Sequence, residues 1–440
     1  MQDYFSAIAD VLGGLLAADE VYTCWYSGEQ SDFVRFNQAR IRQAGRVTQQ
    51  TLNLDWIRGR RHAAVTLTLS GNLHDDRERL AALVAEARQI IAHVPDDPYL
   101  LYATTVHSSV SVQPDRLPPG PVMVDDMLRA VQGKDLVGIF ARGSIHSGFA
   151  NSFGQRNWLT RHSFNVDWSL HLRADKAIKA RYAGFDWQVE ELNERTAHAA
   201  EQLAILERPM RVLTPGEYRV FLSPMALEEI VELLAWGGFG LRAQRTGTSP
   251  LLRMVEEGAR LHHALAFREN TQEGVAPDFD SAGFIRPPAL VLIEGGEYRN
   301  ALVSPRSAAE YGVPGNGANA SEMPQSLDIT GGDLARAEVL SALGTGLYIG
   351  NLWYLNYSDR NAARITGMTR FGTFWVEHGR IQAPVNVMRF DDTVYRLLGD
   401  RLLALTRERE WLLDPGTYGG RSSRSARLPG ALIEAMRFTL

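Results

Sequence analysis

The chain has a single cysteine, Cys24, among 440 residues, so it can form neither an intramolecular disulfide nor a four-cysteine zinc site. A lone cysteine is typical of a protein from a reducing compartment. The sequence also lacks an uninterrupted apolar run of about 18 residues, and it opens with neither a basic segment nor an apolar stretch. We therefore expect no signal peptide, no membrane contact and a cytoplasmic location.

There is little excess of charge of either sign. The 46 basic and 51 acidic side chains leave a formal charge of −5, which gives no electrostatic reason to expect a nucleic-acid partner. Hydrophobic residues make up 45% and charged residues 22% of the chain, as in ordinary globular proteins. A chain of 440 residues is long enough for two or three domains.

Motifs for catalysis and for metal binding are missing too. None of the 11 histidines begins a His-Glu pair, and no two are four residues apart. His262 and His263 are adjacent, but neighbours on a helix point about 100° apart, so the two imidazoles cannot easily bind one metal ion. Ser144 and His146 would share one face of a strand, but a satisfied polar turn is the favoured interpretation over a catalytic dyad. Cys24 lies between apolar residues and is interpreted as an inert, buried thiol. The sequence thus assigns no catalytic residue and no metal ligand.

The first half of the chain alternates between helical and strand periodicity. Helices are predicted over 3–19, 75–92, 123–131 and 186–206, and strands over 21–26, 33–36, 47–54, 63–69, 136–141 and 165–172. Ser27-Gly28-Glu29 is interpreted as a hairpin turn, and the six prolines of 94–121 predict a loop-rich connector that crosses the surface. Helices packed on an antiparallel sheet form an α+β layer, so we predict an N-terminal α+β domain over 1–212.

Two prolines and a glycine in 208–216 mark the expected boundary, and 213–440 is predicted to form a second, β-rich domain. A strand over 217–222 precedes Ser223-Pro224, a strong signal for the start of a helix that runs to about Trp236. Strands are expected within 289–303 and 345–390, helices over 307–311, 333–342 and 393–405, and a loop over 416–427.

The most unusual segment is 346–377, where aromatic and β-branched residues alternate with arginine, aspartate and threonine. If Arg364 begins a strand, its side chain shares one face of the strand with those of Thr366, Met368 and Arg370. The opposite face then carries Ile365, Gly367, Thr369 and Phe371. Guanidinium groups suit carboxylates, and an aromatic wall would hold apolar side chains of a peptide; the wall would consist of Trp353, Tyr354, Tyr357 and Trp375. The candidate peptide-binding residues are Tyr357, Asp359, Arg360, Arg364, Thr366 and Arg370. The alternative is an ion network that only holds the sheet together, formed by Asp359, Arg360, Arg364, Arg370 and Glu377.

Several segments together resemble the TldD/PmbA family, which pairs a metallopeptidase subunit, TldD, with a metal-free relative, TldE or PmbA. They are Tyr26-Ser27-Gly28, Gly148-Phe149-Ala150-Asn151-Ser152, the stretch from Ser304 to Gly312, Ile365-Thr366-Gly367-Met368-Thr369-Arg370-Phe371 and Val376-Glu377-His378-Gly379. The resemblance implies two domains: an N-terminal antiparallel sheet with helices packed on it, and a C-terminal curved antiparallel sheet or barrel with flanking helices.

In TldD-type subunits of the family, a His-Glu-x-x-x-His helix and a distant cysteine bind the metal. That helix should follow Ser223-Pro224, but residues 227–236 contain no histidine and residues 361–364 no cysteine. The resemblance is therefore closer to TldE. It implies no cofactor in this chain, a divalent metal, zinc, in a TldD-like partner subunit, and unfolded or precursor peptides as substrates of the complex. A homodimer is the expectation for the chain alone. Two alternatives stay open: a stand-alone peptide-modifying or hydrolytic enzyme, and a non-catalytic regulatory protein, to which the family's association with DNA gyrase modulation points.

Overall fold

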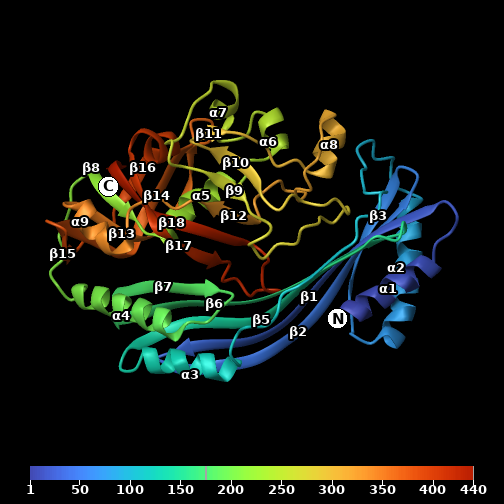
Figure 1. The fold of residues 1–440 in the computed structure, drawn as a ribbon, viewed down its shortest axis with the longest axis horizontal. Helices are drawn as coiled ribbons and strands as arrows, with labels where there is room; N and C mark the ends of the chain where they lie inside the picture. Colours follow the sequence, from blue (N-terminus) through green and yellow to red (C-terminus); the bar gives the residue numbers. More distant parts are fainter. Residues whose placement is uncertain (174–175, 440) are drawn as a thin grey trace.

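The computed structural model describes residues 1–173 and 176–439 and confirms an α+β architecture. Within these residues, one sheet of seven strands and one of eleven strands carry most of the chain. Figure 1 shows the second sheet lying over the concave side of the first, which is long and strongly curved. None of the helices in the described ranges has the length and apolar character that a bilayer crossing requires.

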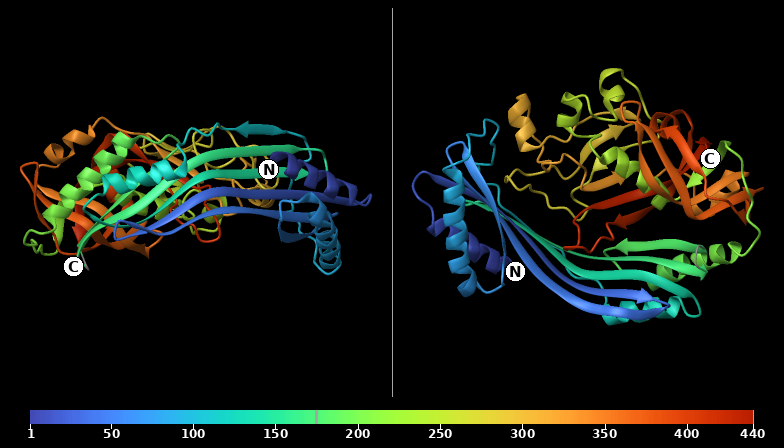
Figure 2. Two further views of the ribbon diagram at one scale, coloured as in Figure 1. Left: turned by 90° about the horizontal axis from the view of Figure 1, so that it is seen from below. Right: turned by 180° about the vertical axis from the view of Figure 1, so that it is seen from behind.

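The N-terminal sheet has the order β3-β2-β1-β5-β6, and β4 and β7 both pair with β6. Helices α1 and α2 cover one end of this sheet, and α3 and α4 lie at the other (Figures 1 and 2). The elements are α1 Gln2–Gly14, β1 Glu20–Asn37, β2 Arg40–Arg58, β3 Arg61–Thr68, α2 Leu73–Ile91, β4 Ser109–Val112, α3 Gly120–Ala130, β5 Asp135–Asn151, β6 Arg156–Arg173, β7 Lys176–Gly184 and α4 Val189–Ile205.

The predicted turn at Ser27-Gly28-Glu29 is wrong, because β1 is one continuous strand of 18 residues. Gly28 pairs with Gln50 on one side and with His146 on the other, so neighbouring strands satisfy its backbone. Gly148 is likewise inside β5, where a Cβ would come within 2.7 Å of the Phe5 ring. These glycines make room for packing rather than for turns.

The C-terminal sheet closes on itself. Strands β8, β13, β14, β16 and β18 follow one another, and β18 pairs back with β8. The elements are β8 Gly216–Leu222, α5 Pro224–Ala235, α6 Leu241–Arg245, α7 Leu252–Glu256, β9 Phe267–Glu269, β10 Leu290–Glu294, β11 Glu297–Tyr298, α8 Pro305–Tyr311, β12 Ser326–Ile329, η1 Arg336–Glu338, α9 Val339–Leu343, β13 Gly346–Asp359, β14 Arg364–Glu377, β15 Arg380–Pro384, β16 Arg389–Thr393, η2 Arg396–Asp400, β17 Leu402–Leu413 and β18 Ser425–Phe438.

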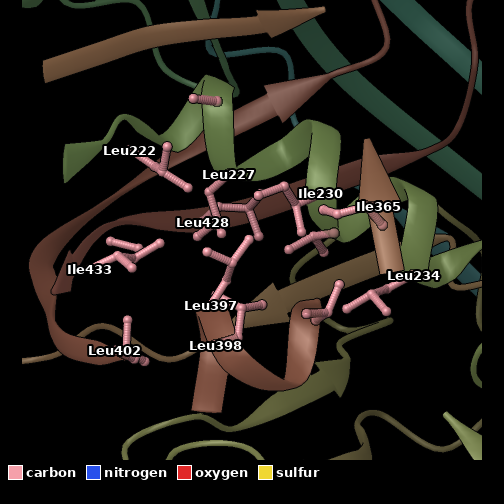
Figure 3. Close-up of a cluster of buried hydrophobic side chains, with 14 of the residues drawn as sticks. Leu222, Leu227, Ile230, Leu234, Ile365, Leu397, Leu398, Leu402, Leu428 and Ile433 are labelled. Atoms are coloured by element: carbon pink, nitrogen blue, oxygen red, sulfur yellow. The ribbon is translucent and has the colours of Figure 1, made fainter. Parts of the chain in front are cut away.

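Helix α5 forms the centre of this domain. Its start is as predicted: the Ser223 hydroxyl accepts a hydrogen bond from the Ala226 amide at 3.2 Å, and Pro224 occupies the first turn. Leu227, Ile230 and Leu234 are fully buried against the strands and η2 (Figure 3). Burial of a leucine or isoleucine side chain contributes roughly 1.5–3 kcal/mol, so this helix face anchors the domain.

The helix predicted over 393–405 is wrong. Thr393 ends β16, a single π-helical turn spans Arg396–Asp400, and Leu402 begins β17. Gly399 has φ −109° and ψ −108°, which is not helical, and the leucines that follow pair with β18 instead. The predicted helix over 333–342 is also shorter, since extended backbone at Ala335 precedes η1 and α9. Helical spacing of leucines did not distinguish these cases from strands.

Two segments of the C-terminal half reach across to the N-terminal sheet. Phe279 is fully buried in a cluster with Phe149 and Leu159, and its ring lies 5.5 Å from that of Trp25. Arg421 donates to the Ser163 hydroxyl at 2.7 Å, in the loop before β18. The boundary between residues 212 and 213 stays a prediction, while these contacts fix how the two sheets face each other.

Candidate functional site

A cavity of about 620 Å³ lies between the two sheets. Helix α4 and strand β7 line it from the N-terminal half. The C-terminal half contributes the start of α5 and parts of β13, β14, β15, η1, α9 and β17. This volume falls in the range of small-molecule and short-peptide sites, which commonly form where domains meet. The cavity is therefore the leading candidate for a binding site.

The turn from β8 into α5 places backbone and side chains at the cavity wall. Ser223 donates its hydroxyl to the Gly350 carbonyl at 2.6 Å, which ties the start of α5 to β13. Gly350 and Gly372 face each other there, and a Cβ on Gly350 would lie 2.9 Å from the Gly372 carbonyl oxygen. A side chain at position 350 would therefore press on β14, so the close approach of the two strands requires glycine there.

A buried ion pair crosses one side of the cavity. Arg181 on β7 donates to Glu228 on α5 at 2.5 Å and to Asp167 on β6 at 2.8 Å. Burial alone lowers the pKa of Arg181, but the carboxylates of Glu228 and Asp167 outweigh it and raise that pKa. Burial raises the pKa of Glu228 to about 7, although Arg181 opposes the shift. One guanidinium thus joins the two halves of the chain.

A second network adjoins the first, because Arg195 also donates to the backbone carbonyl of Arg181 at 3.1 Å. Arg195 on α4 bonds Glu191 and Glu410, each at 2.7 Å, and Arg336 on η1 lies 3.3 Å from Glu410. Burial lowers the pKa of Arg195, and Glu410 more than reverses this effect, so the group stays charged. The cavity therefore has charged walls whose members are matched in pairs.

An imidazole also lines the cavity. Gln202 on α4 donates from Nε2 to Nε2 of His198 at 2.9 Å, and burial lowers the pKa of His198. Burial also raises the pKa of Tyr348, on the facing strand β13, to about 12. These side chains offer hydrogen bonds without net charge, as a site for a peptide backbone requires.

Three of the residues predicted to bind peptide make their hydrogen bonds within the C-terminal half of the chain, away from the cavity. The Tyr357 hydroxyl donates to the Leu233 carbonyl at 2.7 Å, and burial raises its pKa. Arg360 donates to the carbonyls of Thr248 and Trp236, at 2.7 and 2.6 Å, and so caps the end of α5. Asp359 accepts from the Ala362 amide in the hairpin turn. None of these three residues lines the cavity.

The other three lie on the outer face of β14, with the alternation that the sequence predicts. Ile365, Gly367 and Thr369 are buried, while Thr366, Met368 and Arg370 are partly exposed. The prediction fails at Phe371, which is partly exposed because the strand bulges there. Arg364 pairs with Asp391, and Thr366 donates to the Phe390 carbonyl at 3.0 Å. Arg370 stacks over Trp353 at 3.9 Å. The face is therefore partly engaged in structural contacts and partly open. The ion pairs of its charged residues are made with partners outside the network that the sequence predicted, Arg364 with Asp391 and Glu377 with Arg211.

The proposed aromatic wall does not assemble as a unit. Trp353 and Tyr354 are exposed, at 47% and 76%, and their rings lie 5.6 Å apart. Trp375 is buried and carries Arg211 over its ring at 4.3 Å. Within 346–377, the pairing of β13 with β14 shifts register at bulges, one of them between Trp353 and Asn356. These bulges redirect the aromatic side chains.

Sequence reasoning missed the residues of the cavity. Arg181, Arg195, His198 and Glu410 come from three elements in both halves of the chain, and only the fold brings them together. One signal was present in the sequence: Glu228 stands among apolar residues on the buried face of a helix. A buried carboxylate needs a partner, so this position predicts a cation nearby.

The Ser144–His146 pair lies in β5 rather than in a turn. His146 contacts the Ser144 hydroxyl at 2.9 Å and the Thr160 hydroxyl at 3.0 Å, and burial lowers its pKa to about 4. Burial raises the pKa of the Cys24 thiol to about 12, so the thiolate is suppressed. Both groups are held by the interior of the N-terminal sheet.

The side chains near the start of α5 do not fit a zinc site. Zinc in proteins is held by cysteine, histidine and carboxylate ligands, and here Glu228 is already engaged by Arg181. In residues 1–173 and 176–439, no three histidine, cysteine, aspartate or glutamate side chains are grouped so that they could hold a metal ion. We therefore assign no metal-dependent chemical step to the residues of this cavity.

Comparison with known proteins now adds to this geometry. The family model described as the PmbA/TldA metallopeptidase C-terminal domain matches residues 215–440, which is more than half of the chain. The chain belongs to the PmbA/TldD family. The match includes α5, β13 and β14, so the cavity wall from the C-terminal half lies within the matched domain. A comparison with curated protein sequences finds no match.

Solved structures of the family share the whole fold. TldE from Thermococcus kodakarensis superposes with a TM-score of 0.81 at 14% identity, over 99% of this chain and 100% of that one. A candidate modulator of a DNA gyrase from Thermotoga maritima has a TM-score of 0.75, also at 14% identity, with 99% and 100% coverage. Another candidate DNA gyrase modulator, from Bacteroides thetaiotaomicron, gives 0.72 at 14% identity, with 99% and 98% coverage. At this identity the likeness concerns the fold.

Proposed function

We propose that this chain is a TldE-like subunit that binds peptide segments in the interdomain cavity and presents them to a metal centre on a TldD-like partner. The complex as a whole would cleave unfolded or precursor peptides. The observation that carries this proposal is the cavity of about 620 Å³, whose one wall is the helix at which the family resemblance places metal ligands.

The Arg181–Glu228 pair supports a binding role over a hydrolytic one at this position. The Glu228 carboxylate is engaged by Arg181 at 2.5 Å and does not itself line the cavity, so it is not placed to act on a peptide bound there. The walls instead provide matched charges, neutral hydrogen-bonding groups and apolar surface. Such a lining accepts a peptide backbone with varied side chains.

The test measures metal content and peptide cleavage with the full chain. Elemental analysis of the purified protein runs beside a cleavage assay on an unfolded peptide, with and without a TldD-type subunit. We expect no stoichiometric metal and cleavage only when both subunits are present. Cleavage by this chain alone, or a tightly held metal, would contradict the proposal and favour a stand-alone enzyme.

A regulatory protein without any role in proteolysis is the other outcome of this assay. In that case the TldD-type subunit cleaves the peptide equally well with and without this chain. The control is the same pair of proteins with a peptide that the partner alone already cleaves, which shows that the partner is active under the conditions used.

A further inference from the structure

The outer face of the β13–β14 hairpin carries a cation that the rest of the described chain does not neutralise. We call this surface the hairpin face; it consists of Trp353, Thr366, Met368 and Arg370. Arg370 lies 3.9 Å above the Trp353 ring and 5.0 Å from the Phe371 ring. Among the described residues, no carboxylate oxygen lies within 4.0 Å of its guanidinium group.

Arg370 differs in this respect from its neighbours. Arg364 on the same strand pairs with Asp391, and Arg360 donates hydrogen bonds to two backbone carbonyls. Stacking on an aromatic ring fixes the plane of a guanidinium but leaves the N–H groups at its edge free. Arg370 is therefore held in place with its donors available, a geometry that suits bidentate binding of a carboxylate.

The backbone around this pair is strained in a way that supports a binding role. Tyr354 has φ 59° and Phe371 has φ 55°, a region that bulky residues rarely adopt. The pairing of β13 with β14 shifts register between Trp353 and Asn356. Such bulges redirect side chains and occur often beside functional sites. Here they accompany the exposure of Trp353 and Tyr354.

The hairpin face adjoins the interdomain cavity. Arg370 is the direct cross-strand partner of Asn351, and Asn351 lines the cavity together with Gly372. Partners in an antiparallel pair have Cα atoms about 4.5–5.5 Å apart, so the backbone of Arg370 lies beside the cavity wall. A peptide that occupies the cavity could extend along this face without leaving contact with the protein.

We propose that Arg370, seated on Trp353, binds a carboxylate of the peptide whose remainder occupies the cavity. This inference rests on the proposed function, because it requires that the chain bind peptides. Charge complementarity favours this occupant: Arg370 and Arg389 supply the positive charge of this region, while Asp391 is already paired with Arg364. The carboxylate is either the C-terminus of the peptide or an aspartate or glutamate side chain.

The experiment measures binding of fluorescent, unfolded peptides to the full chain by anisotropy. One peptide has neutral side chains and a free C-terminal carboxylate, the second is its C-terminal amide, and the third is the amide with one added glutamate. We expect the carboxylate-bearing peptides to bind about three- to tenfold more tightly than the plain amide, since the site is partly solvated. Comparison of the first and third peptides identifies which carboxylate is bound.

Variants attribute the preference to this pair. Arg370→Gln should bind all three peptides with the affinity of the plain amide, and Arg370→Lys should keep part of the preference because it retains charge but loses the planar fork. The matched control is Arg253→Gln, since Arg253 also stacks on an aromatic ring, Tyr395 at 5.1 Å, but already pairs with Glu257 at 3.0 Å. This control should leave the preference unchanged.

Separate outcomes distinguish failure of this inference from failure of the proposed function. If peptides are bound and cleaved with the partner but the wild type does not prefer a carboxylate, only the role of Arg370 is overturned. If no peptide binds and this chain does not change the rate at which the partner cleaves peptides, both proposals are overturned. Binding of labelled duplex DNA that Arg370→Gln abolishes would also overturn the inference, because the occupant would then be a phosphate.

Discussion

Arg181 on β7 and Glu228 on α5 lie 2.5 Å apart and form a buried ion pair between the two halves of the chain. The guanidinium also contacts Asp167, so it is shared by two carboxylates. Arg181 comes from the N-terminal sheet, and Glu228 from the helix at the centre of the C-terminal domain. This relationship couples the position of the cavity wall to the docking of the domains.

Arg181→Leu should destabilise the protein by about 3–5 kcal/mol, because it leaves the Glu228 carboxylate buried without a partner. The double variant Arg181→Leu/Glu228→Leu should recover most of this loss, since no uncompensated charge remains. Urea unfolding followed by circular dichroism measures both free energies. Arg253→Leu, which breaks an exposed pair with Glu257, is the control and should cost less than about 1 kcal/mol. Equal losses for Arg181→Leu and this control would show that the buried pair has no special role.

Stability should fall with acid because His146 is buried in the neutral form. Burial lowers its folded-state pKa from 6.5 to about 4, so between these pH values the unfolded chain binds more protons than the folded chain. The free energy of unfolding is therefore unaffected by this group above pH 6.5 and falls as the pH drops toward 4. The decrease amounts to roughly 1–3 kcal/mol after allowance for solvent screening. Urea unfolding at pH 7.5 and pH 5 gives the slope, which His146→Gln should reduce. An unchanged slope in the variant would assign the acid sensitivity to other groups.

Arg360→Lys should weaken the fold and leave peptide binding intact. The lysine cannot reach the carbonyls of both Thr248 and Trp236 with the geometry of a guanidinium, and the stacking on Trp236 at 4.9 Å is lost. We expect a loss of about 1–3 kcal/mol in thermal unfolding. Peptide affinity, measured by anisotropy, should match that of the wild type. If Arg360→Lys were as stable as the wild type but bound peptide much more weakly, Arg360 would be a peptide-binding residue after all.

Ala180→Trp should block the cavity without unfolding the protein. Ala180 lines the cavity from β7 and is only partly buried, but it also packs against the hydrophobic cluster beneath α4, so the indole fills cavity volume at some cost in packing. We expect loss of peptide binding and of partner-dependent cleavage, with a stability loss of about 1–3 kcal/mol that leaves the protein folded. Ala64→Trp on the exposed face of β3 is the matched control and should do neither. Full activity of Ala180→Trp would place the peptide elsewhere on the chain.

The sequence predicted the elements whose signals are local. The start of α5 was clear because serine and proline have a physical role at a helix N-terminus that neighbouring residues suffice to specify. The two faces of β14 followed from alternation alone, as the burial of Ile365, Gly367 and Thr369 confirms. The residues of the hairpin face were among those predicted, although no measurement yet tests their role in binding.

Where prediction failed, distant contacts decided the structure. The glycines of β1 and β5 look like turn residues, yet pairing on both edges keeps them in strands. The leucines after Thr393 have helical spacing, yet β18 takes them into a sheet. Local preference amounts to a few tenths of a kcal/mol per residue, which tertiary packing readily overrides.

Residue type and short-range spacing were enough to predict the α+β class, the resemblance to the family and the alternation of the hairpin face. The fold was needed to show that Arg360 caps a helix, that Arg370 keeps free donors and that Arg181 meets Glu228. These outcomes depend on which segments come together in space. Charged side chains reach several ångströms and take whatever partner the fold provides, so their roles cannot be read from neighbouring residues.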